Sequence, residues 1–541
     1  MKKYLLLPAA LLLAGLTAQA QSAMDGFTLS QPGLYGTARF MSMGGAFGAL
    51  GGDLTTLSFN PAGLGVYRSH ELSLTGALDF QNTSMDFNSY KTSKSHTNAL
   101  FNNIGYAASF LFPDSPMRAL NFGVTYNRRA NFNRRYSGYA NSISNSMSNY
   151  MAGVANAYGL TRKDFDTDYP YDSFSLPWID ILGFDSYLIS PVENGGQTNW
   201  YGLYGEGTTG SSSIQVEETG GINEGNFAIG GNLFDKFYWG MDFTYLDVNF
   251  TRRSLYAESL QNAYVMDNED GYFTNTKADW DLFNYYNVTG GGFNYKLGFI
   301  YKPIQELRLG FAFHTPTWYW LEEYYYANTQ YSYPQSAIPN GSNETNEGID
   351  GYNKYNLRTP WRFIFSAAGV IENKLIISAD VDFTDNQYLH FSAPNDYYGY
   401  PGGYKFDPYA STNNQVKDYY KSSVTFRAGL EYRLSPYVSV RAGYAHISNP
   451  VKEDAKENRL TMVTAGTDPS YQLDNTTDYV TAGLGYHYKN FYVDAAYVYR
   501  HQSADWHAFT ADPDYPLDSG AQARMTNSNN QVVVTLGLKF K

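Results

Sequence analysis

The chain has 541 residues, no cysteine and a formal net charge of -13, which leaves no disulfide framework and no electrostatic case for binding nucleic acid. Charged residues make up 16% of the chain and aromatic residues 17%, while the mean hydropathy is -0.42. This balance is typical of a transmembrane β-barrel, in which lipid-facing and lumen-facing residues alternate. A large secreted β-sandwich has much the same composition, so composition alone leaves both classes open.

Residues 1–20 have the features of a secretory signal peptide. Two lysines precede an apolar stretch that ends in the small-residue sequence AQA at 18–20. The alternative, an amino-terminal membrane helix, is disfavoured because this apolar stretch is too short to span about 30 Å of hydrocarbon. We therefore expect an exported protein whose mature chain begins near Gln21.

The mature chain opens with a glycine-rich segment, 21–69, that contains the sequence SFNPAGLGVYR. Its glycines permit close backbone approach, and Asn60-Pro61 fixes a turn, which suits a plug inside a barrel too wide to be filled by its own side chains. A periplasmic linker or an irregular first strand is the alternative. The apolar residues of the segment argue against a solvated linker: Phe40, Met41, Met43, Phe47, Leu50, Leu57 and Phe59.

Beyond residue 69 the chain alternates with the period of two that defines β-strands. In 424–434, for example, Val424, Phe426 and Leu430 lie on one face, and Arg427 and Glu431 lie on the other. Runs of about ten residues are long enough to cross a bilayer when tilted. Fourteen strands are predicted, near 70–80, 97–111, 118–127, 226–233, 237–250, 285–302, 306–325, 354–370, 374–388, 416–434, 437–449, 477–488, 490–502 and 531–540.

The predicted connections alternate between six short turns and seven long loops. A barrel with both chain ends in the periplasm gives this pattern, with its long loops outside the cell. The long loops are predicted at 81–96, 128–225, 251–284, 326–353, 389–415, 450–476 and 503–530. The predicted organisation is thus a signal peptide at 1–20, a plug at 21–69 and a transmembrane antiparallel barrel at 70–541, whose longest loop is about 128–225.

The segment ending in Asn60-Pro61-Ala62-Gly63-Leu64 resembles the amino-terminal hatch of the FadL family of outer-membrane transporters, which take up long-chain fatty acids and other hydrophobic compounds. Later segments resemble the barrel strands of the family in the same order. They are YKLGFIYKPIQELRLGFAFHTP, TPWRFIFSAAGVIENKLIISADVDFTD, FRAGLEYRLSPYVSVRAGYAHISNPV and YVTAGLGYHYKNFYVDAAYVY. The resemblance implies an all-β fold, a fourteen-strand barrel with a hatch in its lumen, in the outer membrane of a Gram-negative type of cell.

The resemblance also implies a route for a hydrophobic ligand. The ligand is captured among the extracellular loops, enters an apolar pocket that the amino terminus reaches, and leaves laterally near the third strand. Burial at each station gains about 25 cal/mol per Å² of apolar surface. A lateral exit requires a kink within 118–127, where the sequence offers only Gly123. The hatch candidates for ligand contact are Phe27, Phe40 and Phe47.

The predicted loop 128–225 contains the apolar sequence LPWIDILGFDSYLI, a candidate first capture site. A packed lid over the barrel mouth is the equal alternative. The candidate residues are Trp178, Ile179, Ile181, Leu182 and Phe184. On the lumenal face, Arg362 and Arg427 are candidates for binding a ligand carboxylate, although such charges usually form ion-pair ladders between neighbouring strands.

The sequence gives no support for catalysis. It contains no HExxH motif, and nothing brings a serine, a histidine and an orienting partner together. We therefore expect no enzyme activity, no cofactor and no metal, and a monomer whose partners are outer-membrane lipid and a hydrophobic ligand. The leading hypothesis is passive transport, and the alternative is a surface barrel whose enlarged loops serve adhesion or partner binding.

Overall fold

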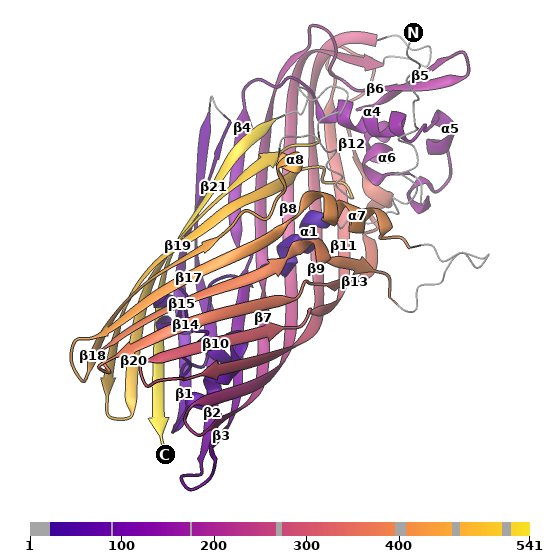
Figure 1. Ribbon diagram of the computed structural model, residues 1–541. Coiled ribbons are helices and arrows are strands. Elements are labelled where there is room, and N and C mark those ends of the chain that lie inside the picture. The colour runs from indigo at the N-terminus through magenta and orange to yellow at the C-terminus, as the bar shows by residue number, and fades with distance from the viewer. Residues whose placement is uncertain are drawn as a thin grey trace, which may run out of the picture.

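The computed structural model describes residues 22–87, 90–173, 176–266, 273–394, 407–456, 466–510 and 521–541. The predicted signal peptide lies outside these ranges. Within them, the main feature is a closed antiparallel β-barrel (Figure 1), which confirms the barrel part of the predicted fold class. None of the described helices is long and apolar enough to cross a membrane.

The described residues form fourteen barrel strands, each antiparallel to its neighbours, and two of these strands are interrupted. Pairing of β1 with both β2 and β21 closes the barrel. In chain order the strands are β1 (His70–Asp86), β2 (Lys91–Leu111), β3 (Met117–Asn131), β7 (Thr209–Leu233), β8 (Phe237–Met266), β9 (Phe273–Tyr301), β10 with β11 (Leu307–His314, Trp318–Ser332), β13 with β14 (Gly351–Arg358, Arg362–Ile371), β15 (Leu375–Asp385), β17 (Ser422–Arg433), β18 (Val438–Ile447), β19 (Tyr471–Tyr488), β20 (Phe491–His507) and β21 (Gln522–Phe540).

The two interruptions lie side by side in the wall and share a Thr-Pro sequence. Pro316 separates β10 from β11, and Pro360 separates β13 from β14, because proline has no N–H to offer the ladder. Threonine side chains replace part of the lost backbone bonding. The Thr317 N–H donates to Thr359 Oγ1 at 2.8 Å, and the Thr359 N–H donates to the Thr317 carbonyl at 3.0 Å.

The two ends of the barrel differ in their connections. At the turn end, where the carboxyl terminus also lies (Figure 1), strands are joined by tight turns, as predicted. At the loop end, the loops predicted at 81–96 and 251–284 are wrong for most of their length. β1 continues to Asp86, β2 begins at Lys91, and β8 continues to Met266. These strands therefore project well beyond the ten or so residues that a bilayer requires.

Along β8 the polarity of the two faces inverts partway. Near the turn end, the outward residues Met241, Phe243 and Tyr245 are apolar or aromatic, and the inward Asp242 and Thr244 are polar and buried. Toward the loop end, Asp247, Asn249 and Arg253 face outward, and Leu246, Val248 and Phe250 face inward. The lower half thus has the pattern of a lipid-exposed barrel and the upper half that of a water-exposed one.

The described part of the segment before β1 folds into short helices. They are α1 (Ala23–Ser30), α2 (Ala38–Ser42), α3 (Thr56–Phe59) and the 3₁₀ helix η2 (Pro61–Val66). Most of its residues are buried. Its hydrogen bonds reach eight strands around the barrel, through Ser109 (β2), Asn121 (β3), Phe299 (β9), Arg308 and His314 (β10), Asp380 (β15), Glu431 (β17), Thr481 (β19) and Thr535 (β21).

The connection between β3 and β7 is the largest at the loop end. It holds β4 (Arg134–Ala140), α4 (Met147–Ala157), α5 (Arg162–Phe165), η3 (Pro170–Asp172), α6 (Trp178–Asp185), β5 (Ser190–Asn194) and β6 (Gln197–Tyr201). We call residues 141–208 the cap, which lies at the loop end of the barrel (Figure 1). Smaller elements at the same end are β12 (Gly341–Glu344), η4 (Thr345–Gly348), η5 (Asn386–Tyr388), β16 (His390–Ser392), α7 (Ala410–Tyr419) and α8 (Glu453–Lys456).

Candidate ligand cavity

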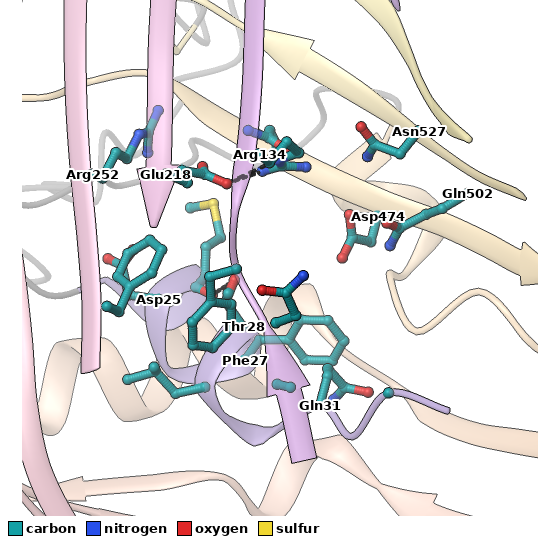
Figure 2. Close-up of a pocket in the computed structure, with 18 of the residues that line it drawn as sticks. Asp25, Phe27, Thr28, Gln31, Arg134, Glu218, Arg252, Asp474, Gln502 and Asn527 are labelled. Atoms are coloured by element: carbon teal, nitrogen blue, oxygen red, sulfur yellow. Dashed lines mark hydrogen bonds and ion pairs between the residues drawn. The ribbon is translucent and has the colours of Figure 1, made fainter. Parts of the chain in front are cut away.

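A cavity of about 260 Å³ lies beside α1. Figure 2 shows Phe27, Thr28 and Gln31 of α1 and its C-cap on one side, with Asp474, Gln502 and Asn527 of β19–β21 across from them. The lining includes more hydrogen-bonding side chains than apolar ones, among them asparagine and glutamine from several strands. The helix side is therefore mixed, with Met24 and Phe27 beside the polar Asp25, Thr28 and Gln31, and the side across from the helix is mainly polar.

Local bonding fixes α1 at this position. Ser22 Oγ accepts a hydrogen bond from the Asp25 N–H at 3.3 Å, and the Asp25 carboxylate accepts one from the Ser22 N–H at 2.8 Å, which is a capping box. Burial raises the pKa of Asp25 above its usual value. The Phe27 ring stacks on Tyr420 with centroids 4.4 Å apart. Phe27, which the sequence suggested by position, thus lines the cavity.

The sequence Asn60-Pro61-Ala62-Gly63 is seated against glycines of the wall. Asn60 Oδ1 accepts from the Ala62 N–H at 3.1 Å, and Asn60 Nδ2 donates to the Gly48 carbonyl at 2.5 Å. A Cβ on Gly298 of β9 would collide with Asn60 Oδ1, and one on Gly240 of β8 would collide with the Pro61 carbonyl group. The barrel glycines thus allow the close approach that this turn requires.

The other aromatic candidates of the segment, Phe40 and Phe47, do not line this cavity and pack on each other. Phe40 contacts Phe47 and Phe59, with ring centroids 5.5 and 5.8 Å apart. All three rings are buried. Phe40 and Phe59 border a second, smaller cavity of about 60 Å³, whereas Phe47 lies against the Arg39 guanidinium.

Arg362 and Arg427 are both engaged by one carboxylate. Arg362 Nε donates to Asp382 at 2.8 Å, and Arg427 Nη2 donates to it at 3.1 Å. Both guanidiniums also lie over the Phe59 ring, 5.6 and 5.0 Å from its centroid. The two arginines border the smaller cavity. With Asp382 they form an ion-pair ladder that also contacts the segment before β1 through Phe59.

Other lumenal charges form a second ladder. Arg441 pairs with Glu431 at 2.7 Å and with Asp494 at 2.6 Å, and Arg39 of α2 pairs with Glu431 at 2.8 Å. These ion pairs join β17, β18 and β20 to the segment before β1. Because each charge has its partner, the ladder offers no open position for a ligand carboxylate.

In the cap, the apolar residues of α6 are mostly buried. Trp178, Ile179, Ile181 and Leu182 belong to a core that includes Met151 of α4, and Trp178 packs on Tyr325 of β11 with centroids 5.0 Å apart. Phe184 is partly buried and contacts Phe165 and Trp200. These contacts are those of a packed lid.

Asp180 lies within this cap core and is fully buried. Neither of its carboxylate oxygens has a hydrogen-bond partner among the described residues. Burial raises the pKa of Asp180 well above its usual range. Burial therefore favours the neutral form of this carboxyl.

Several charged residues of the cavity were absent from the sequence-based candidates. They are Arg134, Glu218, Arg252, Asp468 and Asp474. All five occupy stretches predicted as loops, so their strand positions and partners could not be assigned. The sequence does contain an indication of these strands, because RRYSGYA and SSIQVEETG continue the alternation of the neighbouring strands.

Comparison with known proteins identifies the fold. No protein-family model and no curated protein matches the chain. A FadL homologue from Pseudomonas aeruginosa aligns with 95% of this chain and 100% of its own, at 13% identity and a TM-score of 0.51. The toluene transporter TodX from P. putida aligns over 95% and 99%, at 13% identity and a TM-score of 0.46.

The architecture is that of an outer-membrane β-barrel. Its fourteen described strands and outward apolar belt are the features of that class. Within the class, the chain has the FadL-type fold, an assignment that rests on the P. aeruginosa homologue.

Proposed function

We propose that the protein is a passive outer-membrane transporter of hydrophobic small molecules similar to long-chain fatty acids. The proposal depends chiefly on the cavity beside α1, which lies between the loop end of the barrel and the buried segment before β1. A molecule that enters at the loop end meets Phe27 in this cavity. Passage down a concentration gradient needs no energy-coupling site. The shared fold with the FadL homologue supports the same function.

Residues 21–69 act as the hatch of a barrel that runs from 70 to 541, after removal of a signal peptide at 1–20. The hydrogen bonds of the described part of this segment to eight strands support the assignment. So does the fit of Asn60 and Pro61 against Gly298 and Gly240. The hatch gates movement beyond the cavity, because a fourteen-strand barrel without it is an open pore.

Lateral release takes place where β2 and β3 part. Their ladder runs from Leu111 to Asn103 and ends there, among the described residues, at the pair Asn103–Asn127. The adjacent β3–β7 ladder shifts register between Arg128 and Ala130. Ala130 also lines the cavity, so the break in the wall adjoins the ligand space. The expected position at Gly123 is less suitable, because Gly123 pairs regularly on both sides.

Capture begins at the loop end, with the cap as a lid over the mouth. The burial of Trp178, Ile179, Ile181 and Leu182 supports a lid more than an open capture surface. A cap with its own packed core is also what the second candidate function requires, a surface barrel whose loops bind a partner. The two functions differ in one respect: transport needs the cavity residues, whereas adhesion needs only the outside of the cap.

Uptake by whole cells separates the two functions. Cells that lack their own outer-membrane fatty-acid channel would be supplied with the full-length protein and, in separate experiments, with radiolabelled oleate or its neutral monoglyceride. We expect uptake of at least one of the two well above that of cells without the protein, and a loss of at least fivefold in Phe27→Ala. Tyr169→Ala, in the exposed part of the cap, is the matched control and should keep full uptake. Uptake of both compounds no higher than in cells without the protein, at equal surface expression, would refute transport.

A further inference from the structure

The cavity beside α1 has an apolar part and a polar part. Met24 and Phe27 of α1 lie with Phe250 and Val288 in the apolar part. Across from the helix, Gln502 and Asn527 belong to β20 and β21 (Figure 2). An entirely apolar molecule would cover these amides without replacing the hydrogen bonds that they make to water, and each loss costs about 1–3 kcal/mol.

Two of the three arginines that line the cavity are paired with carboxylates. Arg134 pairs with Glu218 at 2.6 Å. Arg252 lies 3.3 Å from Asp468 and also donates to Ser470 at 2.8 Å. Figure 2 shows Arg134 and Glu218 joined across the upper part of the cavity.

Arg500, the third lining arginine, forms no ion pair among the described residues. It donates to Gln502 at 2.5 Å and is near enough to Asp79 and Asp474 to interact with them electrostatically. The cavity therefore has no guanidinium without a nearby carboxyl group among the described residues. An incoming carboxylate would have to displace a built-in one, or be buried without a partner at a cost of several kcal/mol.

We propose that the cavity selects a neutral amphiphile, with hydroxyl or amide groups at one end and a hydrocarbon chain at the other, over a free carboxylate or a plain hydrocarbon. The polar end lies against Gln502, Asn527 and their neighbours, and the chain lies along Phe27. This inference rests on the proposed transport function and specifies its cargo. A cavity of about 260 Å³ is just below the ~300–1,000 Å³ of typical small-molecule sites, so it holds the polar end and the first part of the chain.

Three probes with the same twelve-carbon chain test the selection: dodecanoate, 1-monododecanoylglycerol and dodecane. Binding of the radiolabelled probes is measured at pH 8 by equilibrium dialysis, with the full-length protein in lipid nanodiscs free of detergent and empty nanodiscs as the reference. We expect the monoglyceride to bind at least tenfold more tightly than either other probe. Dodecanoate or dodecane binding as tightly as the monoglyceride would overturn the inference and leave the transport function standing. Failure of all three probes to bind would overturn both.

Substitution of Glu218 tests the charge argument directly. Glu218→Gln leaves Arg134 without its ion pair, so the affinity for dodecanoate should rise at least tenfold while that for the monoglyceride changes less than twofold. Glu217→Gln is the matched control, because Glu217 is the adjacent residue of β7 and makes the same kind of ion pair with Arg135 on the outward face. The control should bind all probes as the unaltered protein does.

Asp468→Asn provides a second variant should Glu218→Gln fail to fold, since it frees Arg252 in the same way. A gain in dodecanoate affinity in either folded variant supports the inference. No gain in any folded variant, or an equal gain in Glu217→Gln, contradicts it.

Discussion

The lower and upper halves of the same strands have opposite distributions of apolar and polar residues between their two faces. In the lower half of β8, toward the turn end, Phe243 faces outward and Asp242 faces inward; in the upper half, Asn249 faces outward and Val248 inward. The backbone and its pairing partners continue without change. The medium outside the wall thus decides which face is apolar, and strand geometry supplies only the alternation.

The interiors of the two halves differ accordingly. In the lower half, ion-pair ladders such as Arg362–Asp382–Arg427 join neighbouring strands of the wall. In the upper half, Leu246 and Leu282 belong to apolar clusters like those of a soluble protein. Substitutions of the same kind should therefore have unequal effects in the two halves.

The largest effect is expected from Asp382→Asn in the lower half. This change leaves Arg362 and Arg427 buried without their shared carboxylate, which should cost about 3–5 kcal/mol of unfolding free energy. The measurement is urea unfolding of the protein in lipid vesicles, followed by tryptophan fluorescence.

The control for this prediction is Glu322→Gln, which removes an exposed ion pair with Lys354. Its cost should be below about 1 kcal/mol, because exposed pairs contribute little. Equal losses in the two variants would show that the lower interior does not depend on its paired charges.

A smaller effect is expected when the same cation is placed on the outward face of β8 at two heights. Met241→Arg puts a charge in the apolar belt and should cost about 2–4 kcal/mol, whereas Asn249→Arg should cost less than about 1 kcal/mol. Vesicle unfolding measures both variants. Equal costs would contradict the placement of the lipid boundary between Tyr245 and Asp247.

The smallest effect is expected from Asp180→Asn in the cap, and it depends on pH. The folded state keeps Asp180 protonated, while the unfolded chain releases that proton above about pH 4, so cap stability falls as pH rises from there toward the folded pKa. The variant should therefore protect α6 from hydrogen exchange more strongly at pH 8 and equally at pH 4. The exposed Asp172→Asn should show no such difference, and neither variant should alter the barrel strands.

The alternation of the sequence was sufficient to predict the barrel and its strand number, because the belt residues repeat on one face of almost every strand. It failed for 251–284, where Arg252 and Glu258 point inward among apolar residues and blur the pattern. The ion pairs that line the cavity could not be predicted from the sequence for a further reason. Pairing Arg134 with Glu218 requires the strand register, and a slip of one residue would join it to the outward Glu217 instead.

The candidate residues illustrate the same limit. Phe27 was placed by its distance from the mature amino terminus, and it lines the cavity. The apolar residues of α6 were equally compatible with a capture surface and a lid, since an apolar helix has the same sequence whether it packs inward or is exposed. The contact of Trp178 with Tyr325 of β11 favours the lid, and it could not be predicted from the sequence.

The seating of η2 between glycines of β8 and β9, and of α2 against β19 and β20, has a consequence for biogenesis. The segment before β1 contacts strands from both the middle and the end of the chain. Folding of this segment and closure of the barrel at the β1–β21 seam are therefore expected to be coupled, since each depends on contacts with the other.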